Sequence, residues 1–181
     1  MHCPLQTLHS GRTIKFGRTE ALRLGDVAPD FTAETTHGRV RFHDWKAGKW
    51  ALLFSHHRNF TFLGVTGLDA VAALVPELEE RNTKVIGLSA DPLDVQRQWK
   101  SDIEDETGRP VSFPMIADPD RRIAGLYGLI RPNDRVATPR HSAVVIGPDD
   151  KLRLIMTHPA SIARNLVELL SELDCLQLAG T

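Results

Sequence analysis

Long hydrophobic runs alternate with helical patterns along this chain, and turn residues separate them. Two runs, WALLFS at 50–55 and KVIGLSA at 84–90, have the length and composition of strands that are buried on both faces. The segment 68–80 between them has apolar residues at helical spacing, which predicts a helix. Its expected inward positions are Leu68, Val71, Leu74, Val75 and Leu78.

Turn and capping residues predict the next elements. The segment 24–31 has the Asp and Pro of a loop, and 35–45 predicts a small hairpin with its turn at His37-Gly38. The segment 91–106 predicts a helix that is capped by Asp91 and carries a proline in its first turn.

The last third of the chain predicts a strand, a short helix, a hairpin and a closing helix. These elements are expected at 113–118, 120–129, 141–147 paired with 151–158 across Pro148-Asp149-Asp150, and 161–173. The closing helix is amphipathic, with Ile162, Leu166, Leu169, Leu170 and Leu173 inward.

This order of elements predicts an α/β protein, with a mixed sheet flanked by helices. The segment 1–21 is polar and non-periodic, so it is expected to form a flexible N-terminal arm, whereas 22–178 forms one domain. A chain of 181 residues is long enough to bury the core of such a domain.

The composition of the chain limits the classes of partner and the cell compartment that are expected. The net charge of −1 gives no electrostatic argument for binding nucleic acid or an anionic membrane. No apolar run approaches the roughly 20 residues that span a bilayer. The N-terminal stretch has no signal-peptide core, so a cytoplasmic protein is expected. Cys3 and Cys175 are the two thiols, interpreted as incidental in a reducing compartment.

The stretch HHRNFTFLGVTGLDA, at 56–70, is the candidate for chemistry. It joins the first buried strand to the first long helix, and α/β proteins commonly place their sites at such turns. His56, His57 and Arg58 enter the turn, and two glycines stand where a nucleophile would be expected.

Residues 22–178 resemble the peroxiredoxins, and specifically their one-cysteine group. The stretches that carry this resemblance are LGDVAPDFTAETTHG, SHxRxFT at 55–61, GLSAD, WKSDI, FPMIADPDR, TPR at 138–140, VIGPDDKLRL, and HPASIARN at 158–165. The resemblance implies a thioredoxin-like fold and a place in the AhpC/TSA group of thiol peroxidases.

At the active site, the sequence departs from the pattern of the family that it resembles. Thr61, Arg140 and His56 match the family's threonine, activating arginine and frequent histidine, and Arg58 and Arg164 also match. Phe62 stands where the family has proline, Gly64 where it has the peroxidatic cysteine, and Gly67 where it usually has an acidic residue. A glycine has no side chain that a peroxide can oxidise.

The sequence interpretation is therefore a peroxiredoxin-like protein that is not a thiol peroxidase. In the first hypothesis, the former pocket binds or converts a small organic molecule without cysteine chemistry, with His56, Thr61 and Arg140 as catalytic residues. The residues expected to line this pocket are His57, Arg58, Phe62, Leu63, Gly64, Val65 and Gly67. A second hypothesis is a catalytically silent binding protein, and a third is a residual antioxidant peroxidase, so enzyme activity stays open.

No cofactor and no metal site are expected. His56 and His57 are adjacent, so in a continued strand they would point to opposite faces, which suits a shared metal poorly. The expected partners are a small-molecule ligand or substrate and a second copy of the chain in a homodimer, with no nucleic acid and no membrane. The resemblance implies a C-terminal arm across the dimer, and the chain ends at Thr181, before such an arm.

Overall fold

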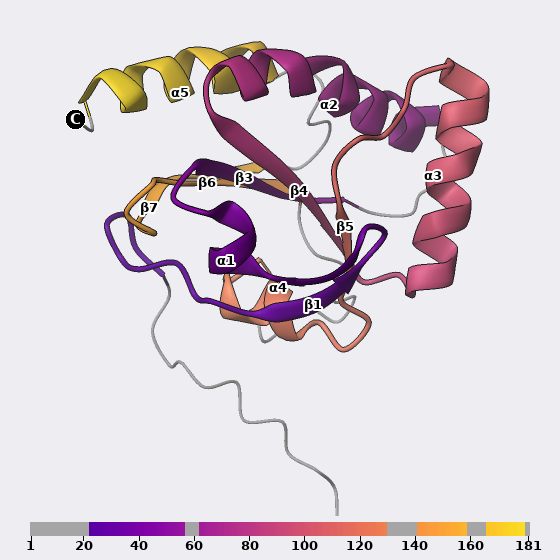
Figure 1. Ribbon diagram of the computed structural model, residues 1–181, viewed down its shortest axis with the longest axis horizontal. Helices are drawn as coiled ribbons and strands as arrows, with labels where there is room; N and C mark the ends of the chain where they lie inside the picture. Colours follow the sequence, from indigo (N-terminus) through magenta and orange to yellow (C-terminus); the bar gives the residue numbers. More distant parts are fainter. Residues whose placement is uncertain (1–21, 57–61, 130–140, 159–165, 180–181) are drawn as a thin grey trace, which may run out of the picture.

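The computed structural model describes residues 22–56, 62–129, 141–158 and 166–179 (Figure 1). Its centre is a seven-stranded sheet with the order β2-β1-β5-β4-β3-β6-β7. The strands are β1 (Thr32–Thr35), β2 (Gly38–Arg41), β3 (Trp50–Ser55), β4 (Thr83–Ser89), β5 (Met115–Ala117), β6 (His141–Ile146) and β7 (Leu152–His158). β3, β4 and β5 are parallel, and β6 runs antiparallel to β3. The predicted α/β class with a mixed sheet is confirmed.

Helices cover both faces of this sheet. The helices are α1 (Phe42–Lys46), α2 (Phe62–Glu80), α3 (Leu93–Thr107), α4 (Arg122–Leu126) and α5 (Leu166–Ala179). In Figure 1, α2 and α5 lie above the sheet, α1 and α4 lie below it, and α3 stands at one side. Among the described residues, no helix combines the length and the apolarity that crossing a membrane requires.

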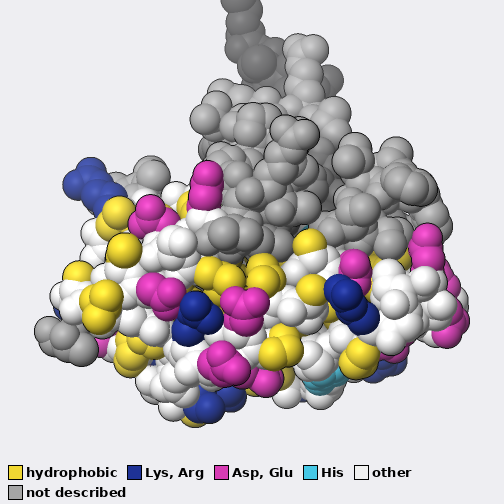
Figure 2. Space-filling model, turned by 90° about the horizontal axis from the view of Figure 1, so that it is seen from above, with side chains coloured by type: hydrophobic (Ala, Val, Ile, Leu, Met, Phe, Trp, Pro, Cys, Tyr) yellow, Lys and Arg dark blue, Asp and Glu magenta, His cyan; other side chains and the backbone are white. Residues whose placement is uncertain are grey.

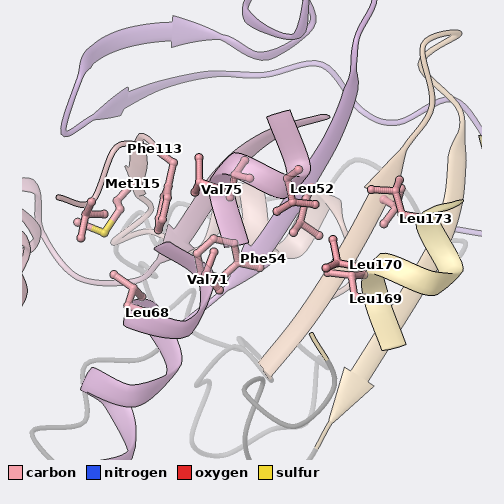
Figure 3. Close-up of a cluster of buried hydrophobic side chains, with 14 of the residues drawn as sticks. Leu52, Phe54, Leu68, Val71, Val75, Phe113, Met115, Leu169, Leu170 and Leu173 are labelled. Carbon is pink, nitrogen blue, oxygen red and sulfur yellow. The ribbon is translucent and has the colours of Figure 1, made fainter. Parts of the chain in front are cut away.

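The two faces carry separate hydrophobic cores. Figure 3 shows the core on the α2 and α5 side, where β3 contributes Leu52 and Phe54. The second core lies on the α1 and α4 side and includes Leu53 and Ile86. All six residues of β3 are buried, as expected for a strand between two covered faces.

On the outer face that carries α2 and α5, acidic and basic side chains are interspersed with small apolar areas (Figure 2).

Several predicted boundaries differ from the structure. The hairpin turn lies at Thr36-His37, because Thr35 pairs with Gly38, and residues 42–46 form α1 instead of continuing the strand. α1 has only five residues, too few to show a helical period in the sequence. β5 begins at Met115, two residues later than predicted.

The predicted start of α3 is wrong. Pro92 occupies the N-cap position and makes no side-chain capping bond. The carboxylate of Asp91 instead accepts a hydrogen bond from the Ser89 hydroxyl at 2.7 Å, so it is already engaged with the end of β4. α2 begins at Phe62, ahead of the predicted Leu68, and α5 ends at Ala179. The predicted first residues of the closing helix, 161–165, lie outside the described residues.

A lysine joins α1 to the β6–β7 hairpin. The side chain of Lys46 is fully buried, and its ammonium lies 2.8 Å from a carboxylate oxygen of Asp150. It also donates to the carbonyls of Lys49, Gly147 and Pro148 at 3.0, 2.9 and 3.1 Å. These four contacts leave the buried charge both paired and hydrogen-bonded, as burial of an ammonium requires.

Candidate active site

The carboxyl ends of the parallel strands define the candidate site. β3 ends at Ser55 and β4 at Ser89, and the chain passes from β3 through 57–61 into α2. Because β6 is antiparallel to β3, its first residues return to this same edge of the sheet. The backbone N–H of Ser142 donates to the Ser55 hydroxyl at 3.0 Å, which ties the start of β6 to the end of β3.

His56 follows β3 and is buried, with 4% of its surface exposed. Its backbone N–H donates to the Leu88 carbonyl at 2.9 Å, so it continues the pairing of β3 with β4. The centroid of its ring lies 5.1 Å from a ring of Trp99 and 5.8 Å from that of Phe54. The imidazole is therefore held between α3 and the sheet by aromatic neighbours.

Gly87 provides the space for this imidazole. A Cβ atom at Gly87 would lie 3.2 Å from both Cδ2 and Nε2 of His56, and 3.3 Å from Cζ of Phe54. These distances are shorter than ordinary van der Waals contacts, so either ring would have to move. The glycine thus fixes the position of His56 through the absence of a side chain.

Gly87→Ala is expected to lower the free energy of unfolding by about 1–3 kcal/mol, because it overpacks the His56 site. Urea denaturation of the two proteins measures this difference. In a His56→Ala background the same substitution should cost less, since one of the two crowded rings is gone. An equal penalty in both backgrounds would contradict the role assigned to Gly87.

A buried carboxylate, that of Asp118, directly follows β5. Asp118 accepts the backbone N–H groups of Ile123 and Ala124 at 3.0 and 2.8 Å, and thereby caps α4. Burial raises the pKa of this carboxyl, while the two backbone hydrogen bonds oppose the change. Since both oxygens are engaged with α4, Asp118 has a structural role at this edge.

Few of the predicted site residues lie in the described part of the chain. His56 lies at the carboxyl edge, directly after β3, and its catalytic role stays a prediction. His57, Arg58, Thr61 and Arg140 lie outside the described residues. The predicted lining residues from Phe62 to Gly67 belong to the first turns of α2. The described residues contain no group of three or more His, Cys, Asp or Glu side chains that could hold a metal.

Trp99 and Gly87 were not predicted as neighbours of His56. Trp99 lies on α3, and Gly87 lies inside a strand that reads only as a continuous apolar run. A glycine within a strand pattern is a signal for a close approach of another group, and it could have indicated this contact.

The family comparison decides the class of protein. The model of the AhpC/TSA family matches residues 24–155, which is most of the chain. The chain belongs to the peroxiredoxin family. This confirms the resemblance to the peroxiredoxins, whereas the assignment of Gly64 to the position of the peroxidatic cysteine stays a prediction.

Individual peroxiredoxins are similar over nearly the whole described domain. Peroxiredoxin-6 of Gallus gallus is 44% identical over 167 residues, covering 88% of this chain and 75% of that protein. The 1-Cys peroxiredoxin of Dictyostelium discoideum is 41% identical over 158 residues, covering 87% of this chain and 65% of that protein. The chain thus spans about two thirds to three quarters of the length of these relatives.

Solved structures give the same fold. A yeast mitochondrial 1-Cys peroxiredoxin superposes with a TM-score of 0.80 at 38% identity, covering 88% of this chain and 78% of that one. The peroxiredoxin 6 of Arenicola marina also gives 0.80, at 36% identity, with 89% and 76% covered.

These comparisons correct the functional interpretation of the sequence. The sequence interpretation was that the protein is not a thiol peroxidase and that its former active-site pocket binds or converts a small molecule without cysteine chemistry. It is wrong, because relatives at 41–44% identity are named 1-Cys peroxiredoxin or Peroxiredoxin-6. The relatives support a peroxidase instead.

Proposed function

We propose that this peroxiredoxin reduces hydroperoxides by thiol chemistry. The similarity to 1-Cys peroxiredoxins carries the proposal, because it extends over 87–88% of the chain. The described geometry supports it, since His56 is held at the junction of β3 with α2. In the proposed site, His56, Thr61 and Arg140 act on the peroxide. Residues His57, Arg58, Phe62, Leu63, Gly64, Val65 and Gly67 line it.

In the proposed reaction, one thiol is oxidised for each peroxide that is reduced. A thiolate sulfur attacks one peroxide oxygen, the O–O bond breaks, and the other oxygen leaves as an alcohol after taking up a proton. The sulfur becomes a sulfenic acid. An added dithiol returns it to the thiol, with release of water and oxidation of the dithiol to its disulfide. A guanidinium such as that of Arg140 would stabilise the negative charge on the departing oxygen.

The source of the sulfur is the unusual part of this proposal. We propose that Gly64 occupies the position of the family's peroxidatic cysteine, so the reacting sulfur belongs to Cys175 or Cys3. Cys175 is exposed on α5 beside Asp174, which is ion-paired with Arg81 just beyond the C-terminal end of α2. The proposed pocket is at the N-terminal end of this 19-residue helix, so Cys175 would react with peroxide at the surface and not in the pocket. Cys3 lies outside the described residues.

The test measures the reduction of hydrogen peroxide and of an alkyl hydroperoxide by the full chain with dithiothreitol. We expect catalytic consumption of peroxide above that of dithiothreitol alone. The double variant Cys3→Ser with Cys175→Ser should lose it, and the two single variants identify the reacting thiol. Wild-type turnover no faster than that of the double variant would overturn the proposal.

A homodimer and a cytoplasmic location stay proposals. The interpretation of the two cysteines as thiols in a reducing compartment supports the location, although one similar structure is that of a mitochondrial protein. Light scattering at micromolar concentration tests the dimer, and a monomer under those conditions would contradict it. The division into an arm at 1–21 and a domain at 22–178 is likewise a proposal.

A further inference from the structure

A cavity lies at the end of the sheet opposite to His56. It has a volume of about 430 Å³ and is lined by the first residues of β4, among them Lys84 and Val85. His56 is bonded to Leu88, near the other end of that strand. Residues 83 and 88 of an extended strand are roughly 16 Å apart, so this cavity is separate from the candidate active site.

The cavity exists because β5 accompanies only the second half of β4. Pairing of β4 with β5 begins at Gly87 and Met115, where the N–H of Gly87 donates to the Pro114 carbonyl. The carbonyls of Asn82 and Leu88 accept hydrogen bonds from the chain along β3. Successive residues of a strand direct their backbone groups to opposite neighbours, so those of Thr83 and Val85 point to the side of β5. No described β5 residue pairs with those two.

The cavity lining combines polar residues with apolar ones from both faces of the sheet. Val85 and Phe113 are buried, with 4% and 3% of their surfaces exposed, and both line it. Trp45 of α1 is half-buried and forms another part of the wall. A pocket of this volume with aromatic walls is in the usual range for small organic ligands, about 300–1,000 Å³.

Two lysines bring positive charge to this cavity. Lys84 donates a hydrogen bond to the Trp45 carbonyl, and its ammonium lies 5.1 Å from the centroid of the indole. Lys49 also lines the cavity and is exposed. Within the described part of the chain, neither ammonium has a carboxylate oxygen within 4.0 Å, whereas Lys46 is paired with Asp150.

The two lysine charges repel each other. Burial lowers the pKa of Lys84, and the charge of Lys49 lowers it further. An anion that contacts both ammonium groups would remove this repulsion. Glu79 is the acidic residue of the lining, and it is exposed, so its carboxylate is solvated and screened.

We propose that this cavity binds a small organic anion, with a carboxylate or phosphate group held by Lys49 and Lys84. The body of the ligand packs on the half-buried Trp45, next to the ammonium of Lys84, and it has the size of an aromatic ring. This site does not depend on the peroxidase activity. It would give the protein a second, non-catalytic binding function.

Calorimetric titration of the full chain with benzoate, benzamide and phenyl phosphate tests this. Benzamide has nearly the shape of benzoate without its charge, so we expect it to bind about tenfold more weakly or worse. Tighter binding of phenyl phosphate than of benzoate would identify the natural group as a phosphate, and the reverse as a carboxylate.

Matched variants locate the binding. Lys49→Gln and Lys84→Gln should each weaken benzoate binding about tenfold or more, and Glu79→Gln should strengthen it. Lys151→Gln removes an exposed lysine outside the cavity lining and should have no effect. Lys49 is exposed, so its substitution tests the site even where Lys84→Gln disturbs the packing on Trp45.

The proposal is overturned if neither anion shows saturable binding. It is also overturned if benzoate and benzamide bind equally, or if Lys49→Gln binds benzoate as tightly as Lys151→Gln does.

Discussion

Lys46→Met is expected to lower the free energy of unfolding by about 3 kcal/mol, the lower end of the range for breaking a buried ion pair. The substitution removes the donor to three backbone carbonyls, those of Lys49, Gly147 and Pro148. Methionine fills similar volume but cannot donate to them. The lower end applies because Asp150 is 36% exposed at its side chain and remains hydrated after its partner is lost.

Urea denaturation followed by circular dichroism measures this difference. Lys151→Met is the matched control, because Lys151 lies next to Asp150 and its ion pair in the described part of the chain is with exposed Asp149 at 3.8 Å. Its cost should stay within about 0.5 kcal/mol. If the Lys46 variant were as stable as the Lys151 variant, the ammonium would not be what holds α1 to the β6–β7 hairpin.

The role of Lys46 also shows the limit of sequence reasoning for this fold. A lysine in the polar stretch KAGK would be expected in solvent. Its acceptors Gly147 and Pro148 are 101 and 102 residues away along the chain, so no local pattern connects them. The buried strands β3 and β4 were predicted to within one residue, because long apolar runs identify a strand without knowledge of its partners.

Part of the candidate site could also be predicted from the sequence, and part could not. His56 was predicted at the end of β3 because that strand is unambiguous and the site follows it directly. Its packing against Trp99 and above Gly87 could not be predicted, since it depends on how α3 and β4 approach β3 in space. The loss of thiol peroxidase activity inferred from Phe62, Gly64 and Gly67 was wrong for a different reason. It judged the activity from one short stretch, whereas the similarity to named peroxiredoxins extends over 87–88% of the chain.

Gly64→Cys is expected to raise the rate constant for hydrogen peroxide reduction by roughly 100-fold, the scale of the gain from correct positioning of a reactive group. Residue 64 is the third residue of α2, at the N-terminal end of this helix. The partial positive charge of a helix N-terminus favours a thiolate, so a cysteine there would be more reactive than an exposed one on α5. Stopped-flow mixing with peroxide measures the rate constant.

Leu63→Cys provides the matched control, because it adds the same thiol one residue earlier and therefore about 100° around the helix. Only the cysteine at 64 would point to where the peroxide is held if Gly64 occupies the nucleophile's position. Phe62 and Gly67 still differ from the family's proline and acidic residue, so the rate should remain below that of a complete family site. Equal rates for the two variants would show that Gly64 does not occupy the position of the family's nucleophile in this peroxiredoxin.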